Sequence, residues 1–231
     1  MSTQTLERPE TVTTTSDQMD GTHPHGSQPD PLSSTPQEGA ATPTHIAMSY
    51  RIGVPDIDGR YPVIIGTDQV LGNAFRWHRD WLVATSTGEH NLRRPPVGTK
   101  GVDMAAAYLA RKYAAGHITP VPLAQVLAEA PQPLHGPVPL LHPRMPITDR
   151  NTYGAKTAFA GLAAHHWRAV RTGFPGSDNH WALACELCGW EGPKFWSHLR
   201  GRNGNPPSAH RHEGGCIGED KVRQLISAYQ Q

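Results

Sequence analysis

The pattern of apolar and polar positions predicts a first folded segment at residues 50–116. Short apolar runs rich in β-branched and aromatic residues lie at 61–66, 70–78 and 81–87, separated by Gly-containing breaks. The spacing then changes to that of a helix over 102–116. The apolar stripe of this helix comprises Val102, Ala105, Ala106, Leu109 and Tyr113. The segment is therefore predicted to be a small three-stranded sheet with one helix, an α+β module.

A second folded segment is predicted at residues 151–231. Phe159, Leu162, His166 and Val170 recur at helical spacing, and the apolar stretch HWALACELCGW follows after a turn. A closing helix is predicted at 219–230, where two acidic residues precede an apolar face. This part of the chain is predicted to be a helix joined to a small C-terminal unit.

The two remaining segments lack such patterns. Residues 117–150 contain eight prolines in 34 positions, and proline cannot donate to a sheet ladder, so we predict a semi-rigid Pro-rich linker with one helical turn near 123–130. Residues 1–49 contain no aromatic side chain, six prolines, and one base against six acids. Because such a composition buries too little apolar surface to offset the entropy of ordering, we predict a disordered tail.

Composition and motifs narrow the functional classes. No run approaches the roughly 18 apolar residues of a membrane span, and the first residues lack the pattern of a signal peptide, so we expect a cytoplasmic protein with no membrane partner. A P-loop, a dinucleotide fingerprint, an HExxH motif and a nucleophile elbow are all missing from the sequence. We therefore assign no catalytic residue, expect no small-molecule substrate, and favour a protein that is not an enzyme.

The cysteines supply the most specific chemical signal. All three lie between residues 185 and 216, with three histidines among them. Cys185-x2-Cys188-Gly is the spacing by which a tight hairpin places two thiolates on one cation, and zinc is the metal that this donor set favours. The two further ligands are predicted to be His198, on a short helix within KFWSHLRGR, and Cys216, with His212 in reserve because His212-x3-Cys216 is also a ligand-like spacing.

These residues resemble C2HC and C2H2 zinc fingers, most nearly the BED-like kind. The matching features are an aromatic residue before the knuckle, Trp181, the Cys185–Cys188 pair, a His-Leu pair at 198–199, and a closing Cys216 or His212. The long loop at 202–211 departs from the usual closure. The resemblance implies a small zinc-stabilised unit that binds nucleic acid or protein.

Three alternatives to a zinc site remain open for the cysteines. A thioredoxin-like redox pair would need the motif at the start of a helix in a βαβ unit. An HNH-like metal-dependent nuclease is suggested by Asn203, Asn205, His210 and His212. In the third alternative the three cysteines are buried core residues and bind no metal.

The distribution of bases suggests a partner. Between residues 194 and 211 there is no acidic residue, and the four bases are Lys194, Arg200, Arg202 and Arg211. The first module carries a second basic set, Arg76, His78, Arg79, Arg93, Arg94 and Lys100. Its β-β-β-α architecture resembles DNA-binding domains of phage-type recombinases. The sequence thus predicts a zinc-binding regulatory or adaptor protein that contacts DNA through the finger and the β-module, or one that docks a protein partner while its zinc is purely structural.

Overall fold

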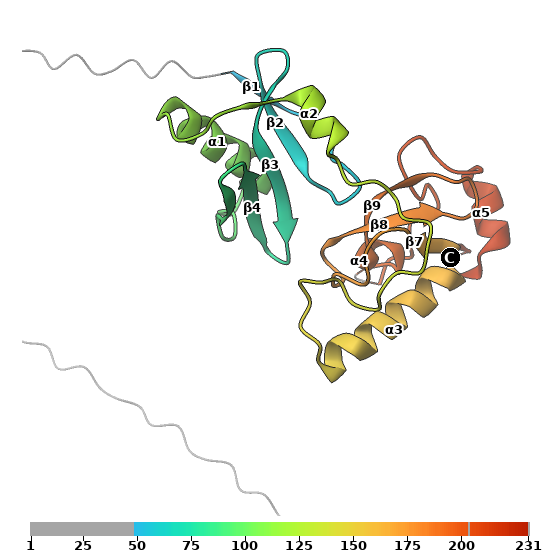
Figure 1. Cartoon of the computed structure of the whole chain (residues 1–231). Coiled ribbons are helices and arrows are strands. Elements are labelled where there is room, and N and C mark those ends of the chain that lie inside the picture. Colours follow the sequence, from blue (N-terminus) through green and yellow to red (C-terminus); the bar gives the residue numbers. More distant parts are fainter. Residues whose placement is uncertain (1–48, 203, 231) are drawn as a thin grey trace, which may run out of the picture. The chain divides into compact units, whose positions relative to one another are not determined.

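The computed structural model describes residues 49–202 and 204–230, and it contains two antiparallel sheets with helices (Figure 1). The chain therefore has the predicted α+β class. The tail predicted to be disordered, residues 1–49, lies outside the described residues except for Ser49.

The first sheet has six strands rather than the predicted three. The three predicted runs correspond to β2 (Tyr61–Ile65), β3 (Gln69–Trp77) and β4 (Asp80–Thr85). The additional strands are β1 (Tyr50–Ile52), β5 (Gly88–Asn91) and β6 (Val121–Pro122). The strand order is β1-β2-β3-β4-β5, and β6 pairs with β3. The additional strands are short, and pairing with a neighbouring strand holds their backbone extended.

Helix α1 (Gly101–Ala114) covers one face of this sheet, as its apolar stripe predicts (Figure 1). Val63, Leu71, Ala74 and Val83 of the sheet form one buried cluster with Ala105, Ala106 and Leu109 of the helix. The small alanine side chains let the helix approach the strands closely, so the module has a core of its own.

The Pro-rich segment packs against the rest of the chain rather than standing free. It contains the short helix α2 (Leu123–Ala128) and an isolated bridge between Leu141 and Phe174. The His142 N–H donates to the Phe174 carbonyl at 3.1 Å, and the Phe174 N–H donates to the Leu140 carbonyl at 3.0 Å. The Pro-rich segment predicted as a linker thus makes backbone hydrogen bonds to the second unit: proline removes individual donors, but the remaining amides still pair.

The second sheet has three strands in the order β7-β8-β9, and α3 packs against it. Helix α3 (Asp149–Ala164) is capped by Thr148, whose hydroxyl accepts from the Asn151 N–H at 3.2 Å. The helix ends earlier than its sequence pattern suggests, because residues 167–169 form β7 (Trp167–Ala169) and pair with β8 (His180–Cys185). Strand β9 (Glu191–Phe195) leads into α4 (Trp196–Leu199), and α5 (Glu219–Leu225) with a 3-10 turn (Ser227–Tyr229) follows later.

The core of this second unit is aromatic. Trp181 is fully buried between the rings of Phe159 and Phe174, at centroid distances of 5.1 and 5.4 Å. Its indole N–H donates to the Thr172 carbonyl at 2.9 Å, so the ring is satisfied as well as packed. None of the helices in residues 49–202 and 204–230 is both long enough and apolar enough to cross a membrane.

Candidate metal centre

The knuckle grows directly out of the second sheet. Alternate residues of β8 face α3, so Trp181, Leu183 and Cys185 all join the same buried cluster. The chain then turns through residues 185–190: the Gly189 N–H donates to the Cys185 carbonyl and the Cys185 N–H donates to the Trp190 carbonyl, both at 2.8 Å. Gly189 has a φ of +79°, a left-handed conformation that glycine adopts without steric cost. The turn brings Cys188 back beside Cys185, as the spacing predicts.

Two residues from the segment between α4 and α5 complete a group of four. The potential ligand atoms of four residues lie within 4.8 Å of one another: those of Cys185, Cys188, His212 and Cys216. The Sγ atoms of Cys185 and Cys216 are 3.6 Å apart, and the Cys188 Sγ lies 3.1 Å from the His212 Nε2. A tetrahedral zinc site has edges of about 3.8 Å between sulfurs and about 3.6 Å between sulfur and nitrogen. The four residues can therefore hold a metal ion.

His212 is oriented for coordination by its surroundings. Its Nδ1 lies 3.0 Å from the Glu213 carbonyl, which can only accept, so Nδ1 carries the proton and Nε2 presents a lone pair to the thiols. The ring is stacked on Trp190 at 4.7 Å with 6° between the planes, and it meets the edge of Trp167 at 6.1 Å. The imidazole thus has both its tautomer and its plane set before any ion arrives.

Arg211 donates hydrogen bonds on the buried side of the cluster. Its guanidinium donates to the carbonyls of His165 and His166 at 2.9 and 3.0 Å, and to the Cys185 Sγ at 3.3 Å. Burial disfavours ionisation of the Cys185 thiol, but hydrogen bonds from Arg211 and from the Leu187 N–H outweigh it, so the pKa of Cys185 lies below its usual value. This cation stabilises a thiolate at the buried corner of the site.

Ionisation of the last thiol is costly without a bound cation. Burial, together with hydrogen bonds to Cys185 and Cys188, raises the pKa of the Cys216 thiol to about 12. Three adjacent sulfurs cannot all be thiolates at neutral pH unless a positive ion lies among them. A divalent cation held by these residues would supply that charge, and its binding would release the remaining protons.

The structure brings the reserve residue of the prediction to the cysteines. His212, held in reserve by the sequence analysis, lies with the three cysteines, whereas His198 is not part of the group. His198 lies exposed on α4, and its ring contacts Phe195 at a centroid distance of 5.1 Å. A helix of only four residues ends the strand at this point and keeps His198 on the outer side.

The structure also corrects one of the four bases predicted to contact nucleic acid. Arg211 is only 5% exposed and donates to groups within the protein, so it does not face a partner. Arg200 and Arg202 are exposed, and Lys194 is half-buried with its Nζ 5.0 Å from the centre of the Trp190 ring. Asn203, invoked for the nuclease hypothesis, lies outside the described residues.

The sequence alone did not identify two residues of the centre, His212 as a member of the group and Arg211 as a buried residue. The spacing of His212 and Cys216 did mark both as candidate ligands, but it did not exclude His198. For Arg211 the only signal was its place next to a histidine in a basic segment, and that signal pointed to the surface.

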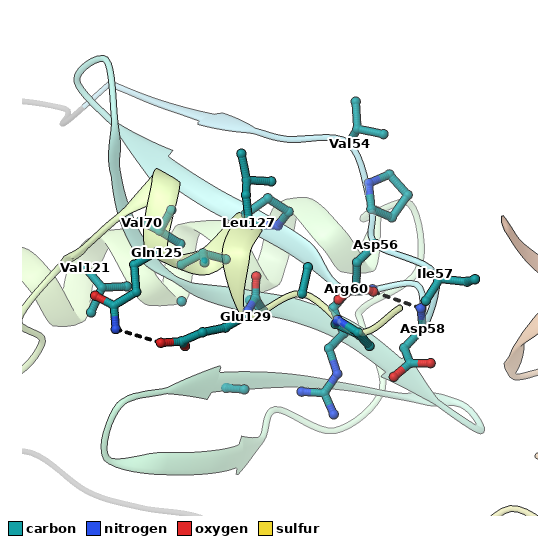
Figure 2. Close-up of a pocket in the computed structure, with 18 of the residues that line it drawn as sticks. Val54, Asp56, Ile57, Asp58, Arg60, Val70, Val121, Gln125, Leu127 and Glu129 are labelled. Atoms are coloured by element: carbon teal, nitrogen blue, oxygen red, sulfur yellow. Dashed lines mark hydrogen bonds between the residues drawn. The ribbon is translucent and has the colours of Figure 1, made fainter. Parts of the chain in front are cut away.

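A pocket of about 930 Å³ is lined by strands β3 and β4, α2 and the loop before β2 (Figure 2), together with Arg171 and Glu191. Several of its polar groups are paired within the protein. Asp56 Oδ1 accepts from the N–H groups of Asp58 and Arg60, both at 2.9 Å, and Gln125 donates to Glu129 at 2.9 Å. These groups are engaged within the protein.

Comparison of the chain with models of protein families, with curated proteins and with solved structures produced no match.

Proposed function

We propose that this chain is a zinc-stabilised, non-catalytic DNA-binding protein. The observation that carries the proposal is the group of three thiols and one imidazole whose donor atoms lie within 4.8 Å of one another. Soft sulfur donors with one imidazole favour zinc over the hard divalent cations, which take oxygen ligands.

A structural role for the zinc fits this donor set better than a catalytic one. Catalytic zinc sites keep one position for water or substrate, whereas structural sites are closed by four protein ligands. Cys185, Cys188, His212 and Cys216 supply all four. Use of His212 as a ligand also removes one of the residues on which the nuclease alternative depends.

The choice of DNA as partner rests on a basic surface beside the site, comprising Lys194, Arg200 and Arg202 around His198. Partial burial of the ring lowers the pKa of His198, and the nearby positive charges of Arg202 and Lys194 lower it further. Arg76 of β3 acts on His198 in the same direction, whereas Asp178 opposes it. The Arg76 guanidinium lies 5.7 Å from the centre of the Phe195 ring. The positive charges of Arg76, Lys194 and Arg202 thus lie near His198, an arrangement suited to a phosphate backbone.

Metal analysis is the first test. Purified protein should contain one zinc per chain, and chelation should abolish binding of a fluorescent DNA duplex, with recovery on addition of zinc but not of magnesium. Zinc at one equivalent with no affinity for DNA would instead favour a protein-docking adaptor. Magnesium-dependent nicking of a plasmid would overturn the non-catalytic assignment.

Salt dependence is the second test. Each phosphate contact contributes about 0.9 to the slope of log K against log salt, so Arg200→Ala with Arg202→Ala should reduce the slope by about 1.8. Arg150→Ala, which removes an exposed base at the start of α3, is the matched control and should leave the slope unchanged. Equal slopes for the double variant and the wild type would remove the basic surface from the proposal.

A further inference from the structure

The loop between β5 and α1, residues 92–100, combines bases with an exposed apolar apex. Arg93, Arg94 and Lys100 are all exposed, and no acidic residue occurs between positions 92 and 102. Val97 at the apex is fully exposed, at 106% of its reference area. Single exposed apolar residues are common on protein surfaces, so the exposure of Val97 is informative only together with the conformation of its loop.

The loop is anchored at its first end and turned tightly at its tip. The Leu92 N–H donates to the Trp81 carbonyl at 2.9 Å, and the Trp81 N–H donates to the Arg93 carbonyl at 3.1 Å, which extends the β4–β5 ladder into the loop. At the tip the Thr99 N–H donates to the Pro96 carbonyl at 3.1 Å, and Gly98 has a φ of +83°. These are the marks of a type II turn with Val97 at its first corner. Val97 is therefore presented at the tip of a hydrogen-bonded turn.

Arg93 adopts a conformation that a basic residue rarely occupies. Its φ is +66°, in the left-handed region, where a side chain costs about 1 kcal/mol relative to glycine. The Arg93 N–H donates to the Asn91 Oδ1 at 2.7 Å, and the Asn91 side chain donates in turn to Asp80 at 2.9 Å. The surrounding hydrogen bonds thus hold an arginine where glycine would be less strained, which is typical of a position used for binding.

We infer that this loop enters the minor groove of duplex DNA, with Val97 and Pro96 wedged against a base step and Arg93 and Arg94 beside it. Apolar wedges, proline among them, flanked by bases are how proteins bend DNA from the minor groove. A groove about 6 Å wide accepts a narrow rigid turn, and its walls carry one phosphate charge per about 1.7 Å of duplex. The inference rests on the proposed DNA binding and adds to it a second contact, in the first module, that deforms the duplex.

An anionic lipid surface is the competing partner for such a loop. A lipid surface attracts each base by about 1 kcal/mol, and one partly inserted valine adds little more, so three bases bind only marginally. A fixed shape of the loop tip does not strengthen binding to a fluid lipid surface, whereas it can match the shape of a DNA groove. The chemistry on the loop therefore favours DNA.

The test uses the full-length, zinc-loaded protein and a duplex labelled at both ends, so that anisotropy reports affinity and energy transfer reports bending. Val97→Ser should weaken binding about tenfold and abolish the increase in energy transfer, with the salt slope unchanged, because it removes apolar contact and no charge. Arg93→Ala with Arg94→Ala should lower the salt slope by about 1.8. Val54→Ser is the matched control, since Val54 is also an exposed valine, 87% exposed, in another loop.

The outcomes separate this inference from the proposed function. If the wild type binds the duplex and responds to loss of Arg200 and Arg202, but Val97→Ser matches Val54→Ser, the loop inference alone is overturned. If the wild type binds no DNA, both proposals fail. Binding to phosphatidylserine vesicles, lost in Val97→Ser while DNA bending is unaffected, would assign the loop to a membrane and overturn the inference.

Discussion

Substitution of His212 by alanine tests the centre most directly. The imidazole is 3% exposed, its Nε2 lies 3.1 Å from the Cys188 Sγ, and its Nδ1 is held by the Glu213 carbonyl. Alanine removes one donor atom and leaves the three thiols in place. The site would then have three protein ligands and an opening for water.

The magnitude follows from the number of ligands. Structural zinc in finger peptides binds with an apparent free energy of about 10–16 kcal/mol at neutral pH. Shared equally among four donors, this gives about 2.5–4 kcal/mol for each, which is a loss of zinc affinity on the order of 10²- to 10³-fold. The stack on Trp190 adds to the stability of the fold rather than to this loss, because the contact does not involve the ion.

Competition with a chromophoric zinc chelator measures the change. His198→Ala and His210→Ala are the controls, since both histidines are exposed and neither belongs to the group of four. Both should retain zinc with the affinity of the wild type. Retention of zinc by His212→Ala together with its loss from His198→Ala would restore the ligand set expected from the sequence and would refute the assignment made from the structure.

Three further predictions concern stability. Trp181→Ala, which empties a fully buried site, should lower the free energy of unfolding by about 3–5 kcal/mol in urea titrations, and a loss below about 1 kcal/mol would contradict the packing described. Chelation should speed hydrogen exchange in residues 204–230, which His212 and Cys216 tie to the sheet, while β8 stays protected by its strand pairs; uniform exchange in both would contradict this division. Burial, aided by Arg76, lowers the pKa of His180 to about 4, against about 6.5 in the unfolded chain. The contribution of the neutral imidazole to the free energy of unfolding is therefore fully present above pH 6.5 and is lost as the pH falls toward 4. Relative to His180→Phe, the wild type should lose roughly 3 kcal/mol over that interval, and parallel pH profiles for the two proteins would be evidence against a buried neutral imidazole.

The sequence by itself determined the elements whose signals are local. Strands β2 to β4 and helix α1 were predicted because alternation and helical spacing are written in neighbouring residues. The same is true of the Cys185–Cys188 knuckle, which needs only a tight turn. Strands β5 and β6 gave no such signal: β5 is exposed at every position and β6 contains a proline. They exist because a partner strand is available, and this is a property of the folded chain.

Only the tertiary structure decided between the two histidines. His198 and His212 are chemically equal donors at plausible spacings, so the choice depends on where the chain returns after residues 200–211. Arg211 holds the returning chain in place, because it donates hydrogen bonds to the carbonyls of His165 and His166 at the end of α3, more than 40 residues away in sequence. The same contact turns a base expected at the surface into a buried support for Cys185. Short-range patterns specify strands, helices and turns, but the donor that reaches an ion is selected by packing between distant segments.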